Sequence, residues 1–140
     1  MLVTKSKKQG AESVWPASAL VPLEANFTDK RGVIQPLVET LFRSAMVIYS
    51  KQGAVRGNHS HGTDWHYCYM LSGSMEYYYR PSGDPKSPEV LIVKAGQMIF
   101  TPPGVDHAMK FLEDTVWLTL SRNPRNQRDY EADLTRIQMV

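Results

Sequence analysis

Short stretches of alternating apolar and polar residues run through most of this chain, and turn-forming residues separate them. Alternation with a period of two is typical of strands that bury one face. The pattern predicts strands over residues 44–50, 65–71, 74–80, 89–93, 97–101, 108–112 and 115–121. We expect the second and third of these strands to form a hairpin, because only Ser72 and Gly73 separate them. Many short strands joined by turns predict a β-sandwich or β-barrel.

The two ends of the chain differ from its middle. Residues 14–24 include a Trp-Pro pair and predict an extended arm, whereas residues 125–137 are polar and charged and predict a short helix or a second arm. The arm and the tyrosine-rich strands further predict a homodimer, with the arm crossing to the partner. The expected division is an N-terminal arm over 1–24, a barrel over 25–123 and a C-terminal tail or helix over 124–140.

Length and composition indicate one ordinary globular domain. The chain has 140 residues, of which 42% are hydrophobic and 21% charged, and this is enough for a single core. The formal net charge of +2 gives no case for nucleic acid or an anionic membrane as a partner. No apolar run reaches the length of a bilayer span, and no signal-peptide core is found. Cys68 is the only cysteine, which excludes an internal disulfide and fits the cytoplasm.

All four histidines lie within two short motifs. The first motif holds His59, His61 and His66, and the second begins at Gly96 and ends at His107. Side chains two residues apart on a strand point to the same face, so His59 and His61 aim at one point. Neutral imidazole is a common ligand of transition metals. The pattern predicts one divalent transition metal (Zn, Mn, Fe, Ni or Cu) bound by the four histidines.

The remaining two histidines reach this point only if the chain turns. His66 lies an odd number of residues beyond His61, and the turn-forming cluster Gly62-Thr63-Asp64 can change the face that His66 takes. The Pro102-Pro103-Gly104 turn directs the strand that carries His107. The alternative is a metal-free site in which one or two of these histidines act as acid and base.

Strand parity also predicts the walls of a cavity beside the histidines. If His66 and His107 point inward, so do the residues two and four positions beyond each of them. These residues are Cys68, Met70, Met109 and Phe111. Apolar walls with a few polar groups are typical of a small-molecule site, although plain core packing explains the two methionines and Phe111 equally well.

Two charged residues beside the first motif complete the candidate site. Arg56 can hold a phosphate or carboxylate through paired hydrogen bonds, or pair with a surface acid. Asp64 is an alternative to His66 as a ligand, or a base, while a turn-stabilising role is the simplest explanation of its position. The candidate catalytic residues are therefore His59, His61 and Asp64.

The two motifs resemble those of the cupin superfamily. Its patterns, G-x5-H-x-H-x3,4-E-x6-G and G-x5-P-x-G-x2-H, correspond here to Gly57, His59, His61, His66 and Gly73, and to Gly96, Pro102, Gly104 and His107. The resemblance implies a single-domain, all-β jelly-roll barrel of the RmlC-like cupin type. His66 stands where the family usually has Glu, so the chemistry of the Glu-bearing dioxygenases does not transfer directly.

A narrower resemblance concerns cupins that modify nucleotide-linked sugars. Residues 56–61 (RGNHSH) are similar to a stretch of the 3,4-ketoisomerases of dTDP-4-keto-6-deoxyhexoses and of capsular-polysaccharide cupin domains. This resemblance implies an isomerase or epimerase of a small hydroxy or keto substrate, a nucleotide-linked keto-sugar. The alternatives are a cupin dioxygenase using Fe, Mn, Cu or Ni, and a non-catalytic, metal-stabilised module that binds a small ligand.

Overall fold

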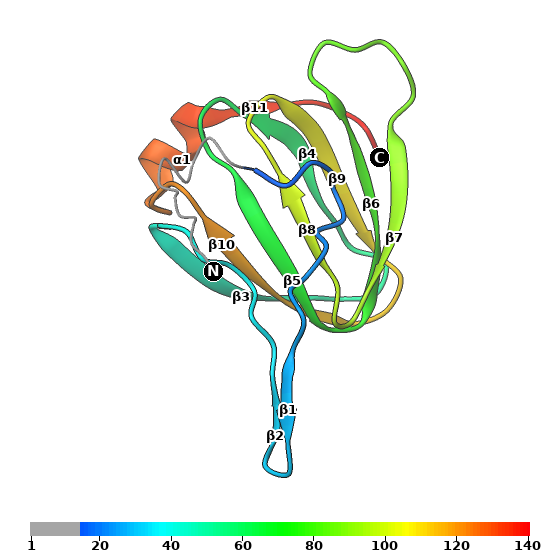
Figure 1. Cartoon of the computed structure of the whole chain (residues 1–140). Helices are drawn as coiled ribbons and strands as arrows, with labels where there is room; N and C mark the ends of the chain where they lie inside the picture. Colours follow the sequence, from blue (N-terminus) through cyan, green and yellow to red (C-terminus); the bar gives the residue numbers. More distant parts are fainter. Residues whose placement is uncertain (1–14) are drawn as a thin grey trace.

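The computed structural model describes residues 15–140, in which two antiparallel β-sheets face each other (Figure 1). The four-stranded sheet has the order β3 (Ser44–Ser50), β10 (Thr115–Ser121), β5 (His66–Ser72) and β8 (Met98–Thr101). The five-stranded sheet has the order β11 (Leu134–Arg136), β4 (Val55–His61), β9 (Val105–Phe111), β6 (Ser74–Pro81) and β7 (Glu89–Lys94). This is the predicted single-domain jelly roll, with two sheets packed face to face and not closed into a continuous barrel.

The seven strands predicted from alternation are all present. β3 and β10 have the predicted bounds, and the largest shift is at β9, which begins at Val105 where residue 108 was expected. In β10, buried and half-buried residues alternate along the whole strand, and β5 begins in the same way. Burial of one face therefore sets the period that the sequence displays.

The predicted hairpin between the second and third strands is wrong. β5 pairs with β10 and β8, whereas β6 pairs with β9 and β7, so these consecutive strands lie in opposite sheets. Gly73 joins them with a φ of +89°, and a Cβ at this position would lie 2.7 Å from the backbone oxygen of Asp114. Only glycine fits this conformation and this close approach. The short connection is a crossover between sheets.

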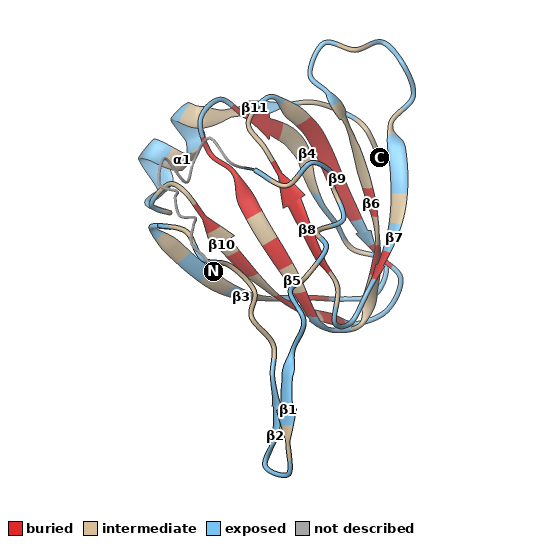
Figure 2. Ribbon diagram, viewed as in Figure 1, coloured by how far each residue is buried: buried red, intermediate tan, exposed pale blue. Residues whose placement is uncertain are grey.

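The hydrophobic core lies between the sheets, where Figure 2 shows buried residues along the inner strands. It includes Met70, Met75, Tyr77, Val93, Ile99, Phe111 and Trp117. Full burial of one large apolar side chain contributes about 1.5–3 kcal/mol, so this cluster is the main source of stability. The register pairs Trp117 with Met70 and, on the same two strands, Ser121 with His66. The core and the histidines therefore occupy opposite ends of the same strands.

Four segments lie outside the seven strands predicted from alternation, and one of them is β4, which carries His59 and His61. A hairpin of β1 (Phe27–Asp29) and β2 (Gly32–Ile34) projects from the two sheets, and the sequence analysis did not predict it (Figure 1). The expected C-terminal helix is present as α1 (Gln127–Asp133), but the strand β11 that follows it was missed. None of the helices described is long and apolar enough to cross a membrane.

The described part of the N-terminal arm runs along β8 of its own chain. The Val21 amide donates to the Met98 carbonyl oxygen, and the Phe100 amide donates to the Ala19 carbonyl oxygen, both at 2.9 Å. These bonds add residues 19–21 to the edge of the four-stranded sheet. The first fourteen residues of the predicted arm lie outside the described residues.

Candidate functional site

The four histidines converge at one end of the space between the sheets. His59 and His61 lie on β4, His66 begins β5, and His107 lies on β9 directly opposite His59. The ring centroid of His61 is 4.7 Å from those of His59 and His66, and 5.5 Å from that of His107. The convergence expected from strand parity and the two turns is therefore present, with His61 at its centre.

An irregularity in β4 brings the first two histidines close to β9. The register of the strand pair shifts between Gly57 and His59, and Gly57 and Asn58 have φ values of +83° and +59°. A Cβ on Gly57 would lie 2.9 Å from the carbonyl oxygen of His107. Glycine is required here, and the bulge places His59 opposite His107.

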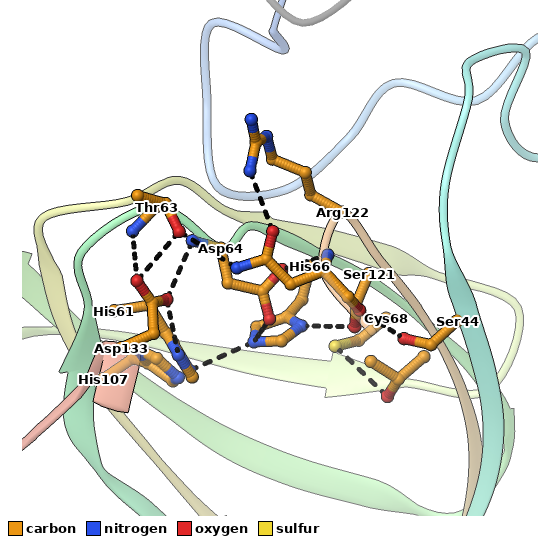
Figure 3. A network of polar contacts seen from close by, with 12 residues as sticks. Ser44, His61, Thr63, Asp64, His66, Cys68, His107, Ser121, Arg122 and Asp133 are labelled. Carbon is orange, nitrogen blue, oxygen red and sulfur yellow. Dashed lines mark hydrogen bonds and ion pairs between the residues drawn. The ribbon is translucent and has the colours of Figure 1, made fainter. Parts of the chain in front are cut away.

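The turn at residues 62–64 changes the face of the chain, as its composition predicted. Asp133, the last residue of α1, accepts hydrogen bonds from two backbone amides of this turn at 2.8 and 3.0 Å, and from the Thr63 hydroxyl at 2.8 Å (Figure 3). The turn passes the chain from one sheet to the other, and His66 then faces the same point as His61. A helix from the far end of the sequence therefore fixes the geometry of the fourth histidine.

Two of the histidines have one ring nitrogen held by a neighbouring group. The Nδ1 of His107 donates to the Val105 carbonyl oxygen at 3.0 Å, which leaves a lone pair on its Nε2. The Nδ1 of His66 lies 2.7 Å from the Ser121 hydroxyl oxygen. Contacts of this kind orient the histidine ligands of metal ions.

The remaining nitrogens fit a shared transition metal. The Nε2 atoms of His61 and His66 lie 3.1 Å apart (Figure 3). Two imidazoles bound to one ion at about 2.0–2.1 Å hold their nitrogens roughly 3.0–3.4 Å apart, so this separation suits two ligands as well as one hydrogen bond. The Nδ1 of His61 is buried without a hydrogen bond and lies 3.8 Å from a carboxylate oxygen of Asp133. The Asp133 carboxylate is therefore the acid beside His61, although it lies beyond hydrogen-bond distance of the Nδ1.

Two overlapping groups could hold such an ion. The first group is His59, His61 and His107, and the second is His61, Asp64 and His66. Within each group the ligating atoms lie within 4.8 Å of one another. Asp64 is 2% exposed and accepts a hydrogen bond from the Asn123 amide at 2.9 Å. Its second oxygen lies 3.7 Å from the Nε2 of His66. Asp64 therefore stabilises the local structure and also stands beside His66 as a candidate ligand.

Burial keeps the histidines neutral. Desolvation, together with repulsion from the neighbouring histidines, lowers the pKa of His59 to about 3 and that of His61 to about 4. Desolvation also lowers the pKa of His66 and of His107. Neutral imidazole is the form that binds metals. A base with so low a pKa is weak near pH 7, so the cluster suits metal binding better than proton abstraction.

A cavity opens beside the cluster, and most of its exposed lining surface is apolar although polar side chains also line it. Its apolar lining residues are Met46, Ile48, Cys68, Ile99, Met109 and Trp117. Its polar lining residues are Arg56, His59, His66, Tyr77, Thr101, His107, Thr119, Arg125 and Tyr130. Cys68 and Met109 thus line the cavity, whereas Met70 and Phe111 are buried in the core cluster beyond it. Burial raises the pKa of the Cys68 thiol to about 12, so this thiol is protonated.

Arg56 lines the cavity but is held by β3. Its Nε donates to the Ser50 hydroxyl oxygen at 2.8 Å, and an Nη donates to the Tyr49 carbonyl oxygen at 3.2 Å. These bonds use part of the guanidinium fork that an anion would need.

Arg125 and Tyr130 were missed by the sequence analysis. The guanidinium carbon of Arg125 lies 3.9 Å from the centroid of the Tyr130 ring, and that ring lies 5.7 Å from the ring of His61. Both residues come from the polar and charged segment over 125–137, for which a short helix or a second arm was expected without any role in the site. The spacing of Asn126 and Asp129, in which Asn126 caps α1, was the one local indication of a helix start.

We expect the metal-free protein to lose stability as the pH falls from about 6.5 to about 4. The unfolded chain protonates His59 and His61 near the ordinary pKa of 6.5, whereas the folded protein protonates them only near 3 and 4. The unfolded state therefore binds more protons in this window, so the free energy of unfolding decreases as the pH falls. Urea denaturation across the window, in the presence of a chelator, measures the slope.

His59→Gln separates the contribution of the cluster from that of the carboxylates. The number of protons taken up on unfolding sets the slope of the unfolding free energy against pH. This number should decrease by up to about one in the variant, because one imidazole with a depressed pKa is removed. An unchanged slope in His59→Gln, or a flat profile in the wild type, would contradict the expectation.

Comparison with known proteins gives a family and a set of similar folds. A family model described as the cupin domain matches residues 45–121, which is more than half of the chain. No curated protein is similar enough to match this chain. The 3,4-ketoisomerase QdtA of Thermoanaerobacterium thermosaccharolyticum, solved in complex with TDP, is 22% identical with a TM-score of 0.69, over 88% of this chain and 89% of that one.

Two epimerases have similar structures. ChmJ of Streptomyces bikiniensis, a 3'-monoepimerase solved with dTDP-quinovose, is 16% identical with a TM-score of 0.71, over 89% of this chain and 73% of that one. The dTDP-4-dehydrorhamnose 3,5-epimerase of Sulfolobus tokodaii is 17% identical with a TM-score of 0.64, over 81% and 73%. At these identities the likeness shows the fold. Together with the family match and the two histidine motifs, it establishes that this chain belongs to the cupin family.

Proposed function

We propose that this protein is a metal-dependent enzyme that isomerises or epimerises a small keto-bearing substrate, namely a nucleotide-linked keto-sugar. The observation that carries the proposal is the convergence of four neutral imidazoles beside one largely apolar cavity. Three solved structures of similar fold support the substrate class, because one was solved with TDP, one with dTDP-quinovose, and one is a dTDP-4-dehydrorhamnose epimerase. The buried, unpaired thiol of Cys68 agrees with a cytoplasmic location.

The site divides into metal ligands and a proton-handling pair formed by His66 and Asp64. His59, His61 and His107 would hold one divalent transition metal (Zn, Mn, Fe, Ni or Cu), with His66 or Asp64 as a fourth group. When bound, such an ion supplies Lewis acidity that polarises a carbonyl or enediol oxygen. The sequence-predicted catalytic set of His59, His61 and Asp64 thus includes two of the proposed ligands.

Asp64 is the proposed base. Burial raises the pKa of its carboxyl group, which strengthens it as a base. Asp64 does not line the cavity, but His66 does, and the two side chains lie 3.7 Å apart. When His66 is not bound to the ion, Asp64 would act through it, because a neutral imidazole can pass a proton between the carboxylate and the substrate carbon without holding it. The apolar walls around Met109 and Trp117 limit the access of water to that carbon.

A metal-dependent cupin dioxygenase is the second candidate. The low pKa values of His59 and His61 favour it, because they make these residues poor bases for removing a carbon-bound proton. The mostly apolar surface of the cavity agrees with it. Consumption of dioxygen together with a substrate distinguishes this candidate from an isomerase.

The purified protein should carry about one transition-metal ion per chain, because four neutral ligands in one place bind such ions strongly. His59→Ala and His107→Ala should each remove most of it, and His66→Ala should retain a weaker site. Elemental analysis after reconstitution with each candidate ion measures the content, and thermal unfolding confirms that the variants fold. Wild-type metal content in both of the first two variants would exclude the proposed site.

Incubation with TDP-4-keto-6-deoxyglucose in D₂O should place deuterium on a carbon beside the keto group, because isomerisation and epimerisation both remove a carbon-bound proton. His66→Ala should slow this exchange by about 10²- to 10⁴-fold, the usual range for loss of a general acid–base group. Proton NMR follows the exchange, and an oxygen electrode runs in parallel. Oxygen uptake would favour the dioxygenase, and neither signal with any nucleotide sugar would favour a non-catalytic binding module.

We also propose a homodimer in which the β1–β2 hairpin packs against the partner. Val33 and Ile34 are 61% and 65% exposed on this hairpin, and Tyr49 is 71% exposed on the edge strand β3. A two-stranded hairpin is marginally stable alone in water, so one that displays apolar side chains needs a covering surface. This proposal moves the crossing element from the predicted arm to the hairpin.

Light scattering at about tens of micromolar protein should give the mass of a dimer, since two-fold pairs are the commonest soluble oligomers. The double substitution Val33→Asp and Ile34→Asp should shift the protein to a monomer, because two buried charges oppose association. Val90→Asp is the control, since Val90 has similar exposure on β7. A wild-type monomer, or a dimer that survives the double substitution, would contradict the proposal.

A further inference from the structure

We propose that Arg125 is the residue that binds the anionic group of the substrate, with the Tyr130 ring holding its guanidinium at the cavity. The proposal deepens the function proposed above and rests on it. It assigns a specificity-determining role to the C-terminal segment, outside both histidine motifs.

Arg125 is available to bind an anion. Within residues 15–140 its guanidinium has no hydrogen-bond or ion-pair partner, and its contact is the face of the Tyr130 ring at 3.9 Å. A guanidinium stacked on an aromatic ring keeps its N–H donors free in the plane of the fork. Both residues line the cavity. The donors are therefore unused beside the site where a substrate would bind.

The other arginines near the site are already engaged. Arg56 donates to Ser50 and Tyr49 on β3, and Arg136 donates to both carboxylate oxygens of Glu131 at 2.9 Å. Arg80, which lies elsewhere, pairs with Asp106 at 3.2 Å. Arg125 alone among these four offers an open fork, so it is the cation best placed to bind a planar or tetrahedral anion.

The segment that carries Arg125 is anchored on both sides. Before it, the Asn123 amide donates to Asp64 at 2.9 Å, and the Asn123 carbonyl oxygen accepts from Ser44 at 3.0 Å. After it, Asp133 binds the turn at residues 62–64. These anchors join the segment to the residues that position His66. A substrate that spans Arg125 and the histidines would therefore contact two parts of one connected framework, which favours a fixed orientation.

The electrostatics of the site agree with an anion at this position. The four imidazoles are neutral, and the charge of Arg125 acts at His59, His61 and His66. Among the residues described, no carboxylate forms an ion pair with Arg125, and Asp64 is the acid whose carboxyl group senses its charge. The ligand chemistry is a carboxylate or phosphate oxygen pair that accepts two parallel hydrogen bonds, with a hydroxyl or keto oxygen reaching the histidines.

Two probes distinguish the sources of this chemistry: dTDP, which offers a pyrophosphate, and lactate, which offers a carboxylate beside a hydroxyl. Isothermal titration calorimetry of the full-length, metal-reconstituted protein should detect binding of one of them. Arg125→Gln should weaken that binding by about 10- to 100-fold, since hydrogen bonds to charged groups are lost. The affinity of Arg125→Lys should fall between those of the wild type and Arg125→Gln, because a point charge replaces the guanidinium fork.

Arg56→Gln is the matched control, since it removes a second cavity arginine whose guanidinium is held by Ser50 and Tyr49; it should weaken binding by less than about threefold. Binding of both probes by Arg125→Gln as in the wild type, an equal or greater loss in Arg56→Gln, or binding of neither probe by the wild type would overturn the proposal. Arg125→Lys serves if Arg125→Gln fails to fold, as judged by thermal unfolding. Metal content and deuterium exchange of the wild type test the proposed function separately from these affinities.

Discussion

The carboxylate of Asp133 is the interaction on which the geometry of the site depends. It accepts three hydrogen bonds from the turn at residues 62–64 and lies 3.8 Å from the buried Nδ1 of His61. The same residue ends α1, and the next residue starts β11 beside His61. Without it the turn would lose the acceptors of two amides, and both His66 and the C-terminal segment would lose their common support. One side chain therefore fixes parts of the chain about seventy residues apart.

The site lowers the stability of the fold, and the core at the other end of the strands compensates. Buried imidazoles with depressed pKa values, an unsatisfied Nδ1 on His61 and the left-handed backbone of Asn58 are each unfavourable in the absence of a ligand. Met70 and Phe111, which share strand faces with His66 and His107, are completely or almost completely buried. Apolar burial of this kind can support a binding site that is not optimised for stability.

The sequence predicted what depends on local periodicity and missed what depends on distant contacts. Alternation revealed the strands, and the i, i+2 spacing of His59 and His61 revealed their shared face, because both follow from the pleat. The Gly73 connection was misassigned because a hairpin and a crossover have the same local composition, and contact with Asp114 decides between them. Arg125 was missed because its position depends on anchors at Asn123 and Asp133, neither of which has a local pattern.

Charge balance is what separates this site from a cupin centre that includes a glutamate. An ion bound by four neutral imidazoles keeps its full positive charge, whereas a carboxylate ligand would cancel part of it. Asp64, the nearest acid, is already engaged with the Asn123 amide and stands beside His66, outside the group of His59, His61 and His107. Arg125 adds a further positive charge to the same cavity. If the proposed ion is bound, a substrate that brings its own negative charge, and that becomes more negative as an enolate forms, would suit the site better than a neutral one.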